Sequence, residues 1–236
     1  MKKAIKSLDY CFYSACSFAK EEKCSEFKFC DGISINLHDY VLNKLVEEQG
    51  GLCAYCMCRM PEIDRRTGKA LRHTIEHIRP QSTTKNTSEW QMELRYSNFL
   101  AVCHGNQGSG GNLCCDKSRK DTLLFLNPLN ESSIRRIAYS NSGEIMADDS
   151  APNKDVINKG LNIVLNLNNG KDLKKKRQKA LNGMKKALQK KGDDQNIDEC
   201  KRKLLLLKNE RNKKIEYVGI LIYWLERHIW KLEKNL

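Results

Sequence analysis

The sequence has no long apolar segment. Its longest, from Tyr217 to Leu225, is about half of the roughly 18 residues that a helix needs to cross a bilayer. Only 4 prolines and 14 glycines occur among 236 residues, which argues against a fibrous or low-complexity chain. The sequence has no internal repeat of fixed period, so it is not that of a solenoid. Near the start, Lys6 and Asp9 interrupt the apolar core that an export signal requires. We therefore expect a globular cytoplasmic protein that does not associate with membranes.

Positive charge is concentrated in the last third of the chain. The formal net charge is +13. Residues 151–236 hold 22 Lys and Arg against 10 Asp and Glu, whereas residues 1–150 hold 20 against 19. This asymmetry indicates a polyanionic partner such as nucleic acid, or else a solvated lysine-rich helix surface, and composition leaves both readings open.

Eleven cysteines are the most informative feature. In a reducing cytoplasm, clustered cysteines are metal ligands more often than disulfides. Cys53 and Cys56 form a Cys-x2-Cys knuckle, and Cys103 and Cys115 supply a second, irregular pair. Four thiolates are typical of a closed, structural zinc site. Buried free thiols are the alternative.

Other residues compete with this ligand set. His104 and Cys114 could each take the place of Cys115, and Cys58 is a spare thiol beside the first knuckle. Four further cysteines near the N-terminus do not have the spacing of a standard zinc module, and their role stays open: Cys11, Cys16, Cys24 and Cys30.

The periodicity of apolar residues predicts mixed α and β structure. Asn36 is the expected N-cap of a helix that Gly50-Gly51 ends. Strands are expected over Leu71–Ile78 and Asn98–Val102, and a helix over Asp116–Leu126. The remainder should be helical, over about Lys154–Leu165, Leu173–Lys190 and Cys200 to the C-terminus.

Between the cysteine pairs lies Thr74-Ile75-Glu76-His77-Ile78-Arg79-Pro80. A carboxylate beside a histidine at a strand end suits metal-assisted hydrolysis, because the carboxylate can hold a divalent cation while neutral imidazole takes a proton from water. Alone, this pair would more often be an exposed histidine with an acidic neighbour.

In combination, these motifs resemble the HNH nuclease family. The resemblance rests on four segments: Cys53-x2-Cys56, Ile75-Glu76-His77-Ile78-x-Pro80, Asn98-Phe99-Leu100-Ala101-Val102-Cys103 and Cys115-Asp116. The glutamate before the histidine, and the aspartate after a long insertion, are most similar to the HNH subunit of the Septu anti-phage defence system (PtuB-like), which also accompanies certain retrons. Val164-Leu165-Asn166-Leu167-Asn168, with Arg177 downstream, is similar to a weaker segment of the same group.

The resemblance implies an α+β fold and a role for each matching residue. Zinc knuckles would hold a ββα-metal core together, followed by a mainly helical C-terminal region. His77 matches the general base, Glu76 the acidic ligand of a catalytic Mg²⁺ or Mn²⁺, and Asn98 the asparagine that braces the loop and orients the histidine. Asp116 matches the second ligand of that cation, a role in doubt if Cys114 replaces Cys115 at the zinc.

Several basic residues are candidate contacts to nucleic acid. Arg79 and Lys117 lie near the expected site in sequence, although each could be an ordinary surface charge. Between Lys171 and Lys191 lie ten basic residues and one acidic residue, on a helix with an apolar stripe. Its candidate backbone contacts are Lys174, Lys175, Lys176 and Arg177.

We divide the chain into three regions: a cysteine-rich segment with a helix (1–49), the HNH core (50–128) and a basic helical region (129–236). The expected function is metal-dependent cleavage of nucleic acid, with DNA favoured, as effector of a defence complex. Its expected partners are an ATPase subunit and, in a retron-type complex, a reverse transcriptase with its RNA or DNA product. The alternatives are an RNA-cleaving effector in such a complex, or a non-catalytic zinc-stabilised nucleic-acid-binding or scaffold subunit.

Overall fold

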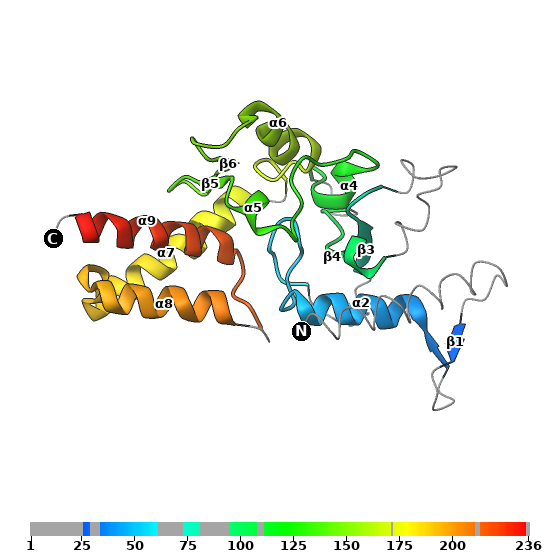
Figure 1. Ribbon diagram of the computed structural model, residues 1–236, viewed down its shortest axis with the longest axis horizontal. Helices are drawn as coiled ribbons and strands as arrows, with labels where there is room; N and C mark the ends of the chain where they lie inside the picture. The colour runs from blue at the N-terminus through cyan, green and yellow to red at the C-terminus, as the bar shows by residue number, and fades with distance from the viewer. Residues whose placement is uncertain are drawn as a thin grey trace.

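The structure is a computed structural model that describes residues 26–28, 34–60, 73–80, 95–107, 111–170, 172–210 and 213–234. Within these ranges the chain is mixed α and β, with short two-stranded sheets beside a larger set of helices (Figure 1). None of the helices in these ranges is long and apolar enough to cross a membrane. The N-terminal cysteines Cys11, Cys16, Cys24 and Cys30 lie outside the described residues.

The strands form three antiparallel pairs among the described residues. They are β1 (Glu26–Lys28) with β2 (Ser34–Asn36), β3 (Thr74–His77) with β4 (Phe99–Val102), and β5 (Ile137–Tyr139) with β6 (Ile145–Ala147). Two groups of helices accompany them. The first is α2 (Leu37–Glu48), the short helix η2 (Tyr96–Asn98), α4 (Cys115–Arg119), α5 (Glu131–Ile134), α6 (Lys154–Lys159) and the π-helical η3 (Gly160–Val164). The second is α7 (Leu173–Lys191), η4 (Asp193–Gln195), α8 (Ile197–Asn209) and α9 (Val218–Lys234).

Helix α2 covers the β3–β4 pair. Its apolar face carries Val41, Leu42 and Leu45, which are buried, and every residue of β4 is buried as well. After the helix, the Gln49 side chain exchanges two hydrogen bonds of 2.8 Å with the backbone of Ala101. This amide therefore satisfies backbone groups of β4, as a neighbouring strand would. The predicted helix ending at Gly50-Gly51 is confirmed, since both glycines have positive φ.

The β5–β6 hairpin, which the sequence reasoning missed, packs onto α7. Its turn contains Gly143, with φ of +85°, and a Cβ there would lie 2.2 Å from the carbonyl oxygen of Lys174. Only glycine permits so close an approach of the turn to the helix. The side chain of Asn168 then bonds both backbone groups of Ile145, at 2.9 Å each, which ties β6 to the segment after η3.

Helices α7, α8 and α9 form the C-terminal part of the chain (Figure 1). Pairs of opposite charge join α8 to α9, Lys201 to Glu233 at 2.7 Å and Lys208 to Glu226 at 2.6 Å. The buried stripe of α9 packs into one apolar cluster that runs from Val41 in α2 to Ile229. The interior of the helical region is thus continuous with that of the cysteine-bearing region.

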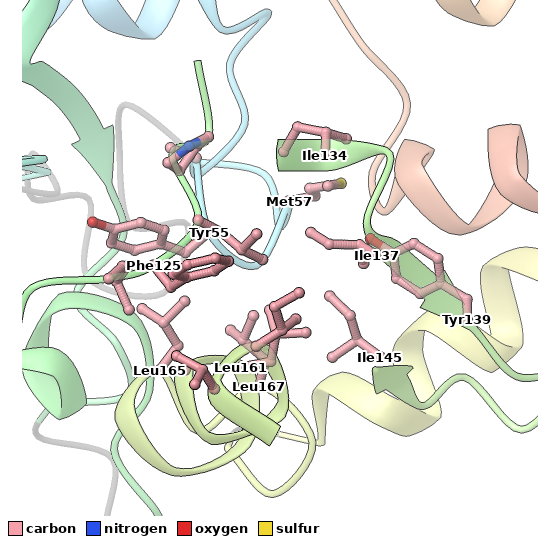
Figure 2. Close-up of a pocket in the computed structure, with 17 residues that line it drawn as sticks. Tyr55, Met57, Phe125, Ile134, Ile137, Tyr139, Ile145, Leu161, Leu165 and Leu167 are labelled. Carbon is pink, nitrogen blue, oxygen red and sulfur yellow. The ribbon is translucent and has the colours of Figure 1, made fainter. Parts of the chain in front are cut away.

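A small apolar pocket lies within this cluster (Figure 2). It encloses about 50 Å³ between Tyr55 and Met57 on one side and Ile145, Leu161 and Leu167 on the other. Its volume is that of a few water molecules, and its mainly apolar lining offers few hydrogen-bond partners to water. It is therefore a packing gap between the two regions, too small for an organic ligand.

Two predicted helices end differently in the structure. The helix expected over Asp116–Leu126 is wrong beyond Arg119, because Lys120 takes a left-handed φ of 53°. The helix expected from Cys200 onward is two helices, α8 and α9. Before α9, the backbone N–H of Tyr217 donates to the carbonyl of Met57 at 3.0 Å, so this connection is held against the first cysteine knuckle.

Arg177 is not a nucleic-acid contact, contrary to the prediction. Its side chain is 3% exposed and donates to the carbonyl oxygens of Gly143 at 2.7 Å and Leu167 at 3.0 Å, and to Asn168 Oδ1 at 2.8 Å. Burial lowers the pKa of this guanidinium. Arg177 is a structural group that joins α7, the hairpin turn and the segment after η3.

Arg177→Met should lower the free energy of unfolding by about 3 kcal/mol, because buried carbonyl groups lose their donor. The matched control is Lys175→Met, which removes the same charge from an exposed site of the same helix. We expect the control to change stability by about 0.5 kcal/mol or less. Urea unfolding followed by circular dichroism measures both, and equal losses would contradict the structural role.

Candidate functional site

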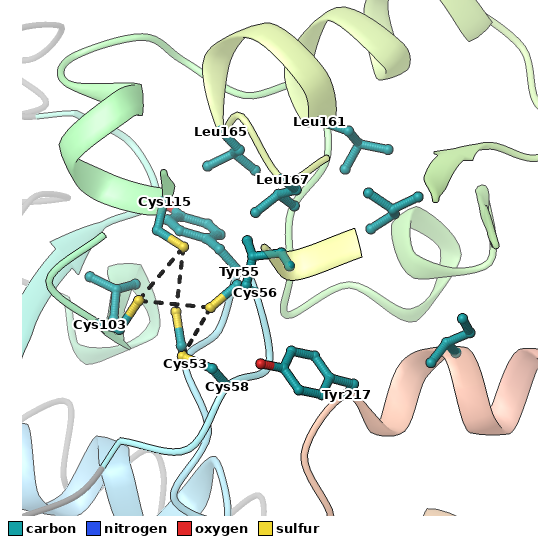
Figure 3. Packing of buried hydrophobic residues seen from close by; sticks show 14 of the residues in the cluster. Cys53, Tyr55, Cys56, Cys58, Cys103, Cys115, Leu161, Leu165, Leu167 and Tyr217 are labelled. Carbon is teal, nitrogen blue, oxygen red and sulfur yellow. Dashed lines mark hydrogen bonds between the residues drawn. The ribbon is translucent and has the colours of Figure 1, made fainter. Parts of the chain in front are cut away.

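Four cysteine thiols converge at one point (Figure 3). The sulfurs of Cys53, Cys56, Cys103 and Cys115 all lie within 4.8 Å of one another and all four residues are buried. Measured edges of this group are 3.7 Å for Cys56–Cys103, 3.8 Å for Cys103–Cys115 and 3.9 Å for Cys53–Cys115. A tetrahedral zinc with Zn–S bonds of about 2.3 Å has sulfur–sulfur edges of about 3.8 Å. The four cysteines could therefore hold a metal ion such as zinc.

The first two ligands lie on a tight hairpin. The backbone N–H of Cys53 donates to the carbonyl of Cys58 at 3.0 Å, and that of Met57 to Cys53 at 3.0 Å. Met57 has φ of 59°, the left-handed conformation that closes the turn. Cys58 lies at the end of this hairpin with its sulfur 3.2 Å from that of Cys56, but it is not a member of the group of four.

The second pair meets although 11 residues separate its members. The intervening loop closes at its base, where the backbone N–H of Cys114 donates to the carbonyl of Gly105 at 2.9 Å. A Cβ on Gly105 would lie 2.0 Å from the carbonyl oxygen of Cys114, and the residue has φ of +53°, so glycine is required there. Closure brings the Cys115 sulfur to 3.8 Å from that of Cys103 despite the irregular spacing, as a pair of metal ligands would require.

The segment after η3 selects Cys115 over Cys114. The backbone N–H of Cys115 donates to the carbonyl of Leu165 at 2.9 Å, and Asn166 Nδ2 donates to the carbonyl of Leu113 at 2.7 Å. Cys114 is fully buried against Gly170. A Cβ added to Gly170 would lie 2.4 Å from the Cβ of Cys114. The side chain of Cys114 therefore packs toward residues 166–170, and Cys115 faces the other three thiols.

Without a cation, four thiols at this distance share their protons. Donation from Cys115 and the other thiols lowers the pKa of Cys103, whereas the Cys103 thiol raises the pKa values of Cys56 and Cys115. One thiolate thus suppresses ionisation of its neighbours. A divalent cation removes this restriction, because it stabilises all four thiolates together.

A buried ion pair lies beside the cysteine cluster. Arg119 is 1% exposed and Glu76 is 8% exposed, and the Arg119 guanidinium is paired with the Glu76 carboxylate. Arg119 also donates to the Tyr55 hydroxyl at 2.9 Å, which in turn donates to Glu76 at 3.2 Å. Burial raises the pKa of Tyr55, so its hydroxyl stays protonated as a donor.

Arg119 also holds the chain after β3. It donates to the carbonyl oxygens of His77 and Ile78, both at 2.7 Å, and to that of Thr122 at 2.9 Å. A planar guanidinium with five donors can serve several acceptors at once. The end of β3 is thereby fixed against α4.

Asp116 lies in the first turn of α4. Its carboxyl acts on the carboxyl of Glu76 in β3. Burial, with a smaller contribution from the Asp116 carboxyl, raises the pKa of Glu76 to about 7 although the charge of Arg119 acts to lower it. Lys117 Nζ lies 3.2 Å from Asp116 Oδ2, so it is a neighbour of this carboxylate. Two carboxylates in contact share a proton or bind a cation between them.

His77 is the last residue of β3 and lies opposite Phe99 in the ladder. Its ring meets that of Phe99 edge to face, with centroids 4.9 Å apart. Successive strand residues point to opposite faces, so the His77 ring and the buried Glu76 carboxylate lie on different sides of β3. Any site that uses both must lie at the strand end.

Asn98 braces the turn that follows His77. Its Oδ1 accepts from the backbone N–H of Arg79 at 2.9 Å, and its own backbone carbonyl accepts from Ile78 N–H at 2.9 Å. A longer bond of 3.4 Å runs from Asn98 Nδ2 to the carbonyl of Arg79. The side chain of Arg79 is exposed at this turn.

Of the predicted site residues, Asp116 is near enough to Glu76 to raise its pKa, and Asn98 lies beside the turn that follows His77, while their roles stay predictions. Sequence reasoning missed Arg119 and Tyr55, which hold Glu76 in place. A signal existed for Arg119, because it follows Asp116 by three residues and so could face the same direction on a helix. No signal marked Tyr55 except its position inside the first knuckle.

Two comparisons with known proteins find no relative of this chain. No protein-family model matches the chain, and the search of curated proteins finds no match.

Cys115→Ser should abolish stoichiometric zinc binding, because it removes one of the four converging thiolates. Cys114→Ser is the matched control one residue earlier, and it should retain about one zinc per chain. Metal content by mass spectrometry and the melting temperature measure the outcome, and we expect a lower melting temperature for Cys115→Ser. The reverse order of metal loss would assign the fourth ligand to Cys114.

Proposed function

We propose that the protein is a metal-dependent endonuclease of the HNH type that hydrolyses phosphodiester bonds of nucleic acid, with DNA favoured. One observation carries this proposal. Strand β3, strand β4 and helix α4 follow one another around the four-cysteine cluster, and the Asp116 carboxyl is near enough to Glu76, the residue before His77, to raise its pKa. This is the order and the residue content that the resemblance to HNH nucleases implies.

The two carboxylates fit a hard divalent cation. Carboxylate oxygens are the ligands that Mg²⁺ and Mn²⁺ prefer, and two carboxylates in contact are the kind of pair that a cation stabilises. Arg119 pairs with Glu76 through Oε1, and a carboxylate has a second oxygen that can serve as a metal ligand. When bound, Mg²⁺ or Mn²⁺ would stabilise the negative charge that develops on the phosphate and the leaving oxygen.

The protein's own groups supply the remaining steps. Neutral His77 removes a proton from the attacking water as general base. Arg119 and Asn98 hold the backbone from His77 to Arg79, which supports a fixed position of the general base. The four cysteines, with zinc as the ion that their spacing fits, would set the position of α4 and therefore of Asp116.

A basic surface on α7 supports nucleic acid as the substrate. Lys175 and Lys176 are exposed there, and Lys174 is half-exposed next to Glu144. Together with Arg79 and Lys117 near the strand end, they are the proposed contacts to phosphates, and such contacts weaken steeply with salt.

A defence complex with an ATPase subunit, and with a reverse transcriptase in a retron-type assembly, is the proposed setting. Apolar side chains on the surface support a protein partner. Phe125, Ile134 and Val156, from the lining of the small apolar pocket, are 45%, 40% and 50% exposed. Apolar residues grouped on a surface mark sites of protein contact.

The ion pair between Arg119 and Glu76 favours a second candidate, a non-catalytic zinc-stabilised module that binds nucleic acid. In that case Glu76 would serve the fold alone. The two candidates differ in whether His77 is needed for cleavage.

His77→Ala should reduce Mg²⁺- or Mn²⁺-dependent cleavage at least 100-fold, because it removes the general base. His104→Ala, a histidine on the cysteine loop, is the control and should cleave as the wild type does. The assay uses plasmid, single-stranded DNA and total RNA, with affinity for the same substrates measured in parallel. Equal cleavage by wild type and His77→Ala would refute the assigned base, and binding without cleavage, also in the presence of the ATPase partner, would favour the inert module.

Cleavage should rise as the pH passes through about 7, because Glu76, with its pKa raised to about 7, must lose its proton to bind a cation. The carboxyl is neutral below this pH and ionised above it. Since cation and proton compete, the midpoint should move to lower pH as the Mg²⁺ concentration increases. Initial rates at two Mg²⁺ concentrations test this, and a midpoint that does not move would argue against Glu76 as a ligand.

A further inference from the structure

A groove of about 400 Å³ lies between α9, α7 and the end of β5. Its α9 wall carries Tyr223, Arg227 and Lys231, which recur every four residues and therefore share one helix face. Tyr139 and the following Ser140-Asn141 form the opposite wall. The groove lies in the helical region, on elements distinct from β3, β4 and α4 (Figure 1).

Aromatic rings line this groove at close spacing. Tyr139 and Tyr223 have centroids 5.8 Å apart with planes at 62°, and Trp224 stacks on His228 with centroids 4.5 Å apart and planes at 16°. The volume lies within the range of pockets that bind small organic groups, about 300–1,000 Å³. Flat rings in such a groove suit flat, uncharged parts of a ligand.

Positive charges accompany the rings. The Arg227 guanidinium lies 5.0 Å from the Tyr223 centroid, and Lys185 Nζ lies 5.1 Å from the Trp224 centroid while donating to Asn141 at 2.8 Å. Asp148 pairs with Arg227 at 2.8 Å. The acidic residues of α9, Glu226 and Glu233, pair with α8 instead. Lys231, which lines the groove, and Lys185, which lies against the Trp224 ring, thus add positive charge beside the Arg227–Asp148 pair.

We propose that this groove binds unpaired nucleotides of a single-stranded nucleic acid. The bases stack on the aromatic side chains, and Lys185 and Lys231 contact the phosphates. Neutral rings beside cations match a nucleotide, which has a flat base and an anionic backbone, and they match an acidic peptide less well because it has no flat group to stack. The proposal rests on the proposed function only in taking nucleic acid as the partner, since binding here requires neither His77 nor a divalent cation.

The test is the affinity of the full chain for labelled oligothymidylate and oligouridylate of about 12 nucleotides, without added Mg²⁺ or Mn²⁺. Trp224→Leu should weaken binding about tenfold. Trp230→Leu is the matched control on the same helix, because Trp230 is 54% exposed, contacts Lys234 and does not line the groove. Equal affinities of the two variants would overturn the proposal, and the DNA and RNA arms identify the preferred sugar.

A second measurement keeps Trp224 intact. In a Trp90→Phe, Trp230→Phe background Trp224 is the sole tryptophan, and stacking of a base should quench its emission. A duplex of the same length should quench it at least tenfold less effectively. Quenching by polyglutamate rather than by oligonucleotide would overturn the proposal in favour of a protein partner, and an absence of quenching by either nucleic acid would overturn it outright. Because no cleavage is involved, these results are independent of the nuclease test.

Discussion

The convergence of four thiols is the constraint on which the rest of the candidate site depends. It draws three separate parts of the chain to one point: the hairpin with Cys53 and Cys56, the end of β4 at Cys103 and the start of α4 at Cys115. The described elements that carry these parts are small: β3 and β4 have four residues each, and α4 has only five. Helices of that length are not stable alone. A metal ion at the four cysteines would supply the free energy that such small elements lack, so that folding and metal binding become one process.

Arg119 acts as a second centre within the same unit. Its buried guanidinium connects α4 to Glu76, Tyr55 and the backbone after β3. A buried charge is costly unless it is paired and its hydrogen bonds are satisfied, and here the partners are the groups proposed to take part in catalysis. The same pair that holds Glu76 in place also lowers its pKa against the effect of burial. The groups that stabilise the fold are therefore the groups of the proposed chemistry. For this reason the same geometry suits both candidate functions, the nuclease and the non-catalytic binding module.

The helical region contributes to the site as well as to the surface. Leu165 and Asn166 bond the backbone around Cys115, and Arg177 holds that segment from α7. Sequence reasoning found the segment through a resemblance but assigned Arg177 to nucleic acid, since a run of basic residues contains no sign of which one turns inward. The hairpin β5–β6 escaped notice for a similar reason, because its strands have three residues each and too few positions to show a period of two.

The sequence alone indicated the four cysteines that could hold a metal ion, the strands around Glu76 and Val102, and the helices α2 and α7, because spacing and periodicity are local properties. Whether Cys114 or Cys115 faces the cluster, where α4 ends, and which arginines are buried depended on contacts between residues far apart in the chain. The contacts of Gly105 and Gly170 with Cys114 decide which cysteine faces the cluster. The end of α4 coincides with the inward side chain of Arg119, which donates to the carbonyl of Thr122. Such contacts follow from close packing in three dimensions, where a change of one position in register exchanges a buried side chain for an exposed one.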